Sequence, residues 1–263
     1  MEPAPYLDRL GIDAAPSPTL ETARRLQRAH VTSVPFENLA IVGDPFAEGD
    51  GRWRATGVDL AVPALYEKVV ERGRGGFCFE LNGLFTWLLR ELGFDADSLA
   101  ARMVGDDRTG RPPANHHTIG VTLDRRYLLD VGMGTPSMRR PLPVDGEELT
   151  DSTGVTWRVV ESDRPDEAFL TQYRLPDGDW EDRYLFSDEP RELSYFRATC
   201  DYLQSAPESP FTGDPVVSIG TEAGYRKLDA DSLLTWAGEE ERRSVTPAEW
   251  YELLETAFGL RYW

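Results

Sequence analysis

The feature of the sequence that most constrains the fold is a change of pattern at Gly93. Before it, the apolar residues follow the three-and-four spacing of one helix face, at Leu81, Leu84, Phe85, Leu88, Leu89 and Leu92. This spacing predicts a core helix that stops at Gly93. After Gly93, short β-like runs alternate with turn residues, which predicts an antiparallel sheet closed or folded into a barrel.

The remaining segments follow the same division. Helices are expected at residues 6–11, 20–30 and 62–72, and strands at residues 98–104, 116–123, 126–133, 156–160 and 168–175. Beyond about residue 190 the pattern is mixed, with a helical or irregular stretch at 196–203, strands at 215–219 and 225–228, and a helix at 247–258. The predicted fold class is therefore α+β.

Length and composition describe a soluble globular protein whose core needs no cross-links. The chain has 263 residues, 40% of them hydrophobic, and no apolar stretch long enough to span a membrane. Cys78 and Cys200 are far apart in sequence, so neither a disulfide framework nor a metal site is indicated. Free thiols and an N-terminus without signal-peptide regions favour a cytoplasmic location with no membrane partner.

The charge balance limits the possible partners. The net charge is −18, from 46 acidic and 28 basic residues, and the only lysines are Lys68 and Lys227. Nucleic acid is bound by clustered positive charge, so a nucleic-acid partner is not expected. An acidic, lysine-poor surface also suggests adaptation to a high-salt cytoplasm.

Cys78 stands at the start of the predicted core helix, after the turn-forming pair Gly75 and Gly76. Unpaired N–H groups and the helix dipole favour an anion at this position, which is one way in which a cysteine pKa is lowered. Arg74 is close enough in sequence to add to that field. A buried structural role is the other interpretation, because free cysteines commonly pack as small hydrophobes.

A nucleophilic thiol needs a base, and the histidines are His30, His116 and His117. His30 lies at the end of a predicted helix, where the dipole favours a cation and a structural role is expected. The other two begin a strand, and Asp130 lies on the returning strand. If the hairpin pairs even-numbered with even-numbered positions, His116 and Asp130 become neighbours on one face.

The alternative register must also be considered. A two-residue loop would match His117 with Asp130, but the turn lacks the Asn-Gly or Asp-Gly sequence that such loops prefer. Parity therefore favours His116. On the same face, the small residues Gly120 and Gly132 are expected to leave room for a ligand.

Several motifs resemble those of the arylamine N-acetyltransferases. Residues 74–82 read Arg-Gly-Gly-Phe-Cys-Phe-Glu-Leu-Asn, residues 116–121 read His-His-Thr-Ile-Gly-Val, and residues 130–134 read Asp-Val-Gly-Met-Gly. Residues 34–39, Val-Pro-Phe-Glu-Asn-Leu, the opening stretch 6–11 and residues 202–211 match as well. The resemblance runs in order along nearly the whole chain. The family's aliphatic and valine positions fit only if His116 is the first residue of its motif.

The resemblance implies a three-part architecture with a cysteine-protease-like triad of Cys78, His116 and Asp130. The parts would be a helical bundle at residues 1–92, a β-barrel at 93–190 and an α/β lid at 191–263. Acetyl-CoA would be the donor, and an arylamine, arylhydrazine or N-hydroxyarylamine the acceptor, with no metal. Substrate or CoA contacts are expected from Phe36, Phe77, Asn115, Met133, Gly134, Tyr202 and Ser209.

Two departures and two alternatives accompany the resemblance. Met133 replaces an aromatic residue that many members of the family carry, which concerns the shape of the acceptor pocket. His117 could compete with His116 for the thiol proton. A cysteine hydrolase or transglutaminase-like enzyme would use the same triad on an amide. A non-enzymatic protein would keep Cys78 as core.

The charge balance generates a first prediction. Added salt screens the self-repulsion of an acidic surface, so the free energy of unfolding is expected to rise between low and molar salt. Urea denaturation at a series of salt concentrations measures this dependence. A stability that stays constant or falls would contradict the high-salt hypothesis.

Overall fold

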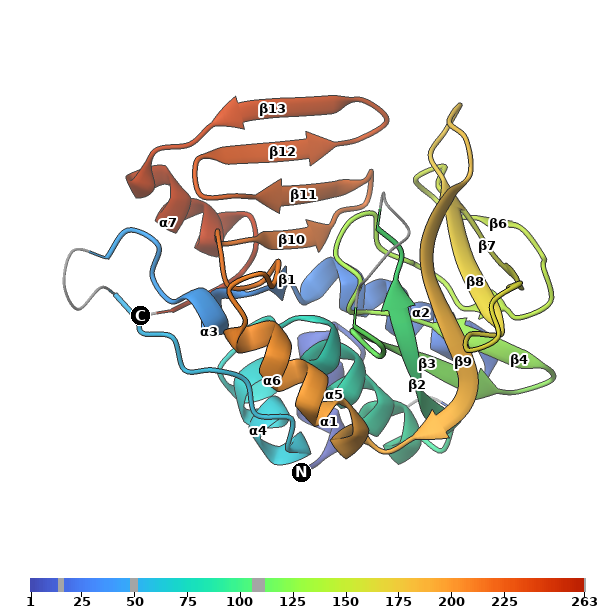
Figure 1. The fold of residues 1–263 in the computed structure, drawn as a ribbon. Coiled ribbons are helices and arrows are strands. Elements are labelled where there is room, and N and C mark those ends of the chain that lie inside the picture. The colour runs from blue at the N-terminus through green and yellow to red at the C-terminus, as the bar shows by residue number, and fades with distance from the viewer. Residues whose placement is uncertain (14–16, 48–51, 106–111, 263) are drawn as a thin grey trace.

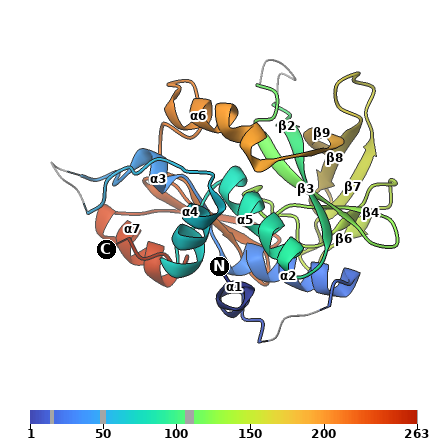
Figure 2. The ribbon, with the colours of Figure 1, turned by 90° about the horizontal axis from the view of Figure 1, so that it is seen from below.

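The computed structural model describes residues 1–13, 17–47, 52–105 and 112–262. A group of helices adjoins an eight-stranded and a five-stranded antiparallel sheet (Figure 1). The view from below brings the helices forward and shows α5 beside the strands β2 and β3, which it contacts (Figure 2). The predicted α+β class is confirmed.

The predicted helices before Gly93 are present. The helical elements are α1 (Pro3–Arg9), α2 (Leu20–Ser33), α3 (Leu39–Val42), α4 (Val62–Tyr66), the π-helical segment η1 (Glu67–Glu71) and α5 (Cys78–Glu91). The hydroxyl of Thr19 caps α2 by accepting the N–H of Thr22 at 3.2 Å, which satisfies one of the free donors of the first turn. The helix expected at residues 62–72 changes to π-helical geometry at Glu67.

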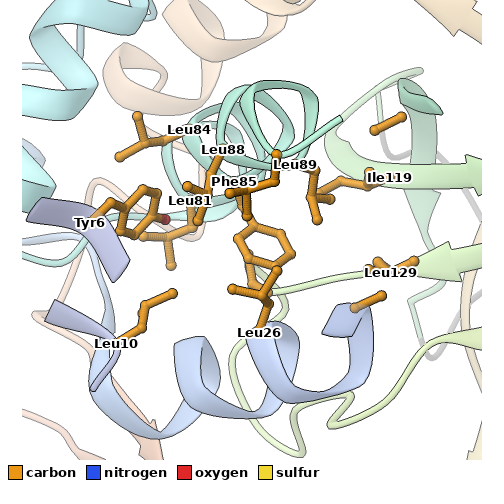
Figure 3. Packing of buried hydrophobic residues seen from close by; sticks show 14 of the residues in the cluster. Tyr6, Leu10, Leu26, Leu81, Leu84, Phe85, Leu88, Leu89, Ile119 and Leu129 are labelled. Atoms are coloured by element: carbon orange, nitrogen blue, oxygen red, sulfur yellow. The ribbon is translucent and has the colours of Figure 1, made fainter. Parts of the chain in front are cut away.

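Helix α5 is the centre of the largest apolar core (Figure 3). Leu81, Phe85 and Leu88 are fully buried there. On one side they meet Tyr6 and Leu26 from α1 and α2, and the cluster continues into the barrel strands. The helix that carries Cys78 is thus fixed between the helical part and the barrel.

The eight-stranded sheet has the order β5-β4-β3-β2-β9-β8-β7-β6. Its strands are β2 (Asp95–Met103), β3 (His116–Thr122), β4 (Arg126–Leu129), β5 (Leu142–Pro143), β6 (Leu149–Thr150), β7 (Thr156–Glu161), β8 (Phe169–Arg174) and β9 (Glu181–Arg191). Strand β5 at one end of the sheet contacts β7 near the other, so the sheet nearly closes. The expected barrel is therefore confirmed.

The hairpin of β3 and β4 has the predicted parity. Gly120 pairs with Leu128 and Thr122 with Arg126, so even positions face even positions. One detail is corrected: a Cβ on Gly120 would lie 2.3 Å from the Arg126 guanidinium. Gly120 therefore makes room for that side chain and not for a ligand.

The five-stranded sheet joins residues from both ends of the chain. It contains β1 (Phe36–Glu37), β10 (Val217–Gly220), β11 (Tyr225–Leu228), β12 (Ser232–Trp236) and β13 (Glu240–Ser244), in that order. Phe36 pairs with Ser218, which links the segment 1–92 to the segment 191–263. The proposed division into three domains at residues 92 and 190 stays a prediction.

The C-terminal segment also contributes helices: the 3-10 turn η2 (Leu193–Phe196), α6 (Arg197–Ser205) and α7 (Pro247–Thr256). Trp250 and Leu254 of α7 pack with Val217 and Leu228 of the five-stranded sheet. Helix α7 begins with a capping box between Thr246 and Glu249. In the described part of the chain, no helix has the length and apolarity needed to cross a membrane.

Six strands were not expected from the sequence: the two-residue strands β1, β5 and β6, and the longer strands β9, β12 and β13. β9 has only three buried residues among eleven, and every residue of β13 is exposed. Neither segment shows the alternation that predicts a half-buried strand. β9 is a strand because it pairs with β2 and β8, and β13 because it pairs with β12.

Candidate active site

Cys78 is the first residue of α5, as predicted. The carboxylate of Glu80 accepts the N–H of Phe77 at 3.1 Å and so fixes the start of the helix. Cys78 is 3% exposed, and it lines a cavity of about 500 Å³ together with His116. The thiol is buried but borders a space that can hold a ligand.

His116 contacts Asp130, the pairing that parity favoured. The His116 Nε2 atom lies 2.6 Å from Asp130 Oδ2, and both side chains are buried. Because Nε2 is engaged by the carboxylate, Nδ1 is the ring nitrogen left to exchange a proton with a second group. The predicted contact between His116 and Asp130 is confirmed.

Asp130 is fully buried, which by itself would raise its pKa. His116 opposes this effect, and the carboxylate also accepts hydrogen bonds from the Asn82 side chain and the Gly132 N–H, each at 2.9 Å. These interactions hold the pKa of Asp130 below its usual value. The carboxylate is therefore ionised beside the imidazole.

Asn82 connects the thiol helix to the Asp130 segment. It stands four residues after Cys78, on the same face of α5. Its amide donates to Asp130 and to the His117 carbonyl, and its oxygen accepts the Val131 N–H at 2.8 Å. Gly132 allows the close approach, since a Cβ there would lie 2.7 Å from Cys78 Cα.

Strand β9 supports the site from the barrel side. The ring of Tyr184 lies 4.9 Å from the His116 ring between centroids. The neighbouring Arg183 donates to the carbonyls of Met133 at 2.9 Å and Thr135 at 3.3 Å. Arg183 thus holds the segment that follows Asp130.

The pKa of Cys78 differs in direction from the expectation based on the helix end. Burial raises it and the Asp130 carboxylate adds to the rise, while backbone N–H groups of His117 and Phe79 lower it. Arg74 does not supply the expected field, because its guanidinium lies over the ring of Tyr262 at 3.0 Å. The thiol therefore needs a nearby base to lose its proton.

His117 and His30 are buried and neutral. The ring of His117 stacks on Phe196 at 4.5 Å, and neither ring nitrogen has a hydrogen-bond partner within the described residues. Burial lowers the pKa of His117 to about 3 and that of His30 to about 3. His30 lies 2.7 Å from the Tyr6 hydroxyl, so its role is structural but not cationic.

The cavity brings together most of the residues expected at the site. Its lining consists of Phe36, Cys78, Met103, Pro112, Asn115, His116, Gly132, Met133, Tyr202, Leu203, Glu208, Ser209, Pro210 and Phe211. Two predicted contacts fall outside this set. Phe77 is wholly buried and packs on Phe79 and Phe211, and Gly134 lies behind Phe36.

Several residues of the site were not assigned a role from sequence. Asn82 could have been found, because it stands one helical turn after Cys78 in a quoted motif. Glu208 likewise lies within the quoted motif at residues 202–211, whereas Met103 gives no local signal. Arg183 and Tyr184 belong to strand β9, which was missed. Within the described residues, no cluster of three His, Cys, Asp or Glu side chains could hold a metal.

The neutral state of His117 predicts a pH dependence of stability. Its pKa is about 3 in the folded protein and about 6.5 when unfolded, so the unfolded chain binds more protons between these values. The free energy of unfolding should therefore fall as the pH drops below about 6.5, by up to about 1.4 kcal/mol per unit for this group.

His117→Phe removes that contribution. Urea unfolding between about pH 7 and pH 5 should show a shallower slope for the variant than for the wild type, by about one proton. Above about pH 7.5 the difference between the two proteins should be constant, which serves as the internal control. Equal slopes in the acidic range would contradict a neutral His117.

Comparison with known proteins identifies the family of the chain. The N-acetyltransferase family model matches residues 19–262. The chain is 31% identical to the arylamine N-acetyltransferase of Mycolicibacterium smegmatis, over 97% of this chain and 90% of that protein.

Solved structures are similar over the whole fold. The arylamine N-acetyltransferase from Mycobacterium abscessus has a TM-score of 0.85 and 32% identity, covering 99% of this chain and 90% of that chain. The arylamine N-acetyltransferase from Mycobacterium marinum, solved in complex with CoA, has a TM-score of 0.85 and 28% identity, covering 98% and 93%. The chain belongs to the arylamine N-acetyltransferase family and is an acetyl-CoA-dependent acyltransferase.

Proposed function

We propose that this protein transfers the acetyl group of acetyl-CoA to the nitrogen of an arylamine, arylhydrazine or N-hydroxyarylamine, by a ping-pong mechanism through acetyl-Cys78. One observation carries the proposal: Cys78 and His116 line the same cavity, and the Nε2 atom of His116 lies 2.6 Å from Asp130 Oδ2. The relative from Mycobacterium marinum, whose structure contains CoA, supports acetyl-CoA as the donor.

In the first half-reaction, His116 Nδ1 accepts the proton of Cys78 and the sulfur attacks the thioester carbonyl. Collapse of the tetrahedral intermediate breaks the bond between the acetyl carbon and the CoA sulfur. The imidazolium returns the proton to the CoA thiolate. Asp130 stabilises the imidazolium while it exists, which offsets the cost of a thiolate in a buried position.

In the second half-reaction, the amine enters the space left by CoA and attacks the acetyl carbon of acetyl-Cys78. His116 accepts the amine proton, and the departing sulfur is reprotonated. The cavity must exclude water at this stage, because water would hydrolyse the intermediate. Phe36, Met133 and Phe211 provide apolar walls suited to an aromatic acceptor.

The polar residues of the lining have structural bonds as well. The Asn115 side chain accepts the Met103 N–H at 2.9 Å, and Ser209 donates to the Leu203 carbonyl. We infer that these bonds shape the wall along which CoA enters. The Tyr202 hydroxyl donates to Glu208 at 3.0 Å, so toward a ligand it can act as an acceptor. Phe77 and Gly134 do not line the cavity, so we expect them to support the lining residues and not to contact the ligand.

We also infer a cytoplasmic enzyme that acetylates foreign aromatic amines. The free cysteines Cys78 and Cys200 suit a reducing compartment. A net charge of −18 is compatible with high internal salt, which would weaken the repulsion between the protein and the phosphates of CoA.

Mass spectrometry of the intact protein tests the proposed chemistry. Acetyl-CoA alone should add one acetyl group, and an aromatic amine should remove it with formation of the N-acetyl product. Cys78→Ser should abolish the labelling. Release of acetate at the same rate with and without the amine would indicate a hydrolase and contradict the proposal.

Variants of the two adjacent histidines provide a matched pair. His116→Gln should slow acetylation of Cys78 by about a hundredfold or more, since it removes the general base. His117→Phe should retain most of the activity, because its ring stacks on Phe196 and takes no part in proton transfer. The opposite order of effects would assign the base to His117.

A further inference from the structure

Among the described residues that line the cavity, one carries a carboxylate. Glu208 lies in the loop that follows α6 and lines the cavity together with Cys78 and His116. Its carboxylate accepts a hydrogen bond from the Tyr202 hydroxyl at 3.0 Å, and Tyr202 lines the cavity too. The carboxylate therefore lies at the solvent-exposed edge of the cavity, where the hydrogen bond from Tyr202 orients it.

The loop that carries Glu208 is itself well anchored. The Ser209 N–H donates to the Ala206 carbonyl at 3.0 Å, and its hydroxyl donates to the Leu203 carbonyl. Thr212 donates from its hydroxyl to the Ala206 carbonyl at 2.8 Å. The position of the carboxylate is thus defined by its flanking backbone as well as by Tyr202.

No positive side chain balances this charge within the described residues. Glu208 forms no ion pair there, and the described lining contains no lysine or arginine. The catalytic His116 is engaged with Asp130. Among the described residues of the lining, Glu208 is therefore the charge that a ligand meets without a balancing cation.

We propose that Glu208 selects acceptors by charge, favouring uncharged or cationic aromatic amines over carboxylated ones. This inference rests on the proposed function, because it concerns the amine that discharges acetyl-Cys78. The apolar residues Phe36, Met133 and Phe211 accommodate the aromatic ring of either kind of acceptor. Glu208 therefore distinguishes acceptors by the charge of the substituent on their aromatic ring.

The expected effect is moderate. Two unit charges separated by roughly 7 Å in a partly solvated cavity change a rate constant by about three- to tenfold. Salt should reduce the effect, because the cavity borders solvent. The discrimination is therefore best measured at low ionic strength and as a ratio between substrates.

Three para-substituted anilines provide the probes: para-aminobenzoate as the anion, methyl para-aminobenzoate as the neutral form and para-aminobenzamidine as the cation. The measured quantity is kcat/KM for discharge of the acetyl-enzyme. Ratios to the neutral ester are compared between wild type and Glu208→Gln, so that the intrinsic reactivity of each amine cancels. Glutamine can still accept the Tyr202 hydroxyl, so this variant removes the charge and keeps the hydrogen bond.

Glu208→Gln should raise the relative kcat/KM of the anion about three- to tenfold and lower that of the cation. Glu241→Gln is the matched control, since Glu241 is exposed on β13 and does not line the cavity. It should leave both ratios unchanged. Tyr202→Phe keeps the carboxylate and should retain the preference against the anion.

The outcomes separate the two proposals. Ratios that do not move in Glu208→Gln, or move equally in Glu241→Gln, would overturn charge selection by Glu208. In that case, acetylation of the neutral ester would leave the proposed function intact. Failure to acetylate Cys78 and the ester would instead reject the proposed function itself.

Discussion

The site depends on the contact between the buried carboxylate of Asp130 and the imidazole of His116. A carboxylate without a partner in this environment would be strongly destabilising. His116, Asn82 and the Gly132 N–H together compensate for its burial. The bond to Asp130 engages Nε2 of His116 and leaves Nδ1 for proton exchange in the cavity that Cys78 also lines. The electrostatic cost of the buried charge is therefore offset by the groups that position His116, the proposed catalytic base.

This arrangement requires that α5 and the barrel hairpin be held together rigidly. The core around Phe85 fixes the helix, and Asn82 bonds from the helix to the Asp130 segment. Gly132 lets the segment approach the backbone of Cys78. The thiol and the imidazole come from different parts of the fold, so their relative position is set by packing between those parts and not by either one alone.

The sequence predicted the features that depend on local periodicity. The apolar spacing after Leu81 located α5, and the two-residue period of strands identified His116 as the partner of Asp130. The direction of the Cys78 pKa shift could not be predicted, because burial outweighs the helix end and depends on the whole fold. Strand β9, which carries Tyr184, was missed because its residues do not alternate between buried and exposed. It is a strand because it pairs with β2 and β8.

The rate of alkylation of Cys78 by iodoacetamide as a function of pH tests the central claim most directly. With Cys200→Ser as the background, peptide mapping would report modification at Cys78. We predict rapid alkylation near neutral pH when His116 is present. In His116→Gln, reaction should require alkaline pH, because burial then raises the thiol pKa without a base to accept the proton. Equal rates at neutral pH in both proteins would contradict the claim that His116 activates Cys78.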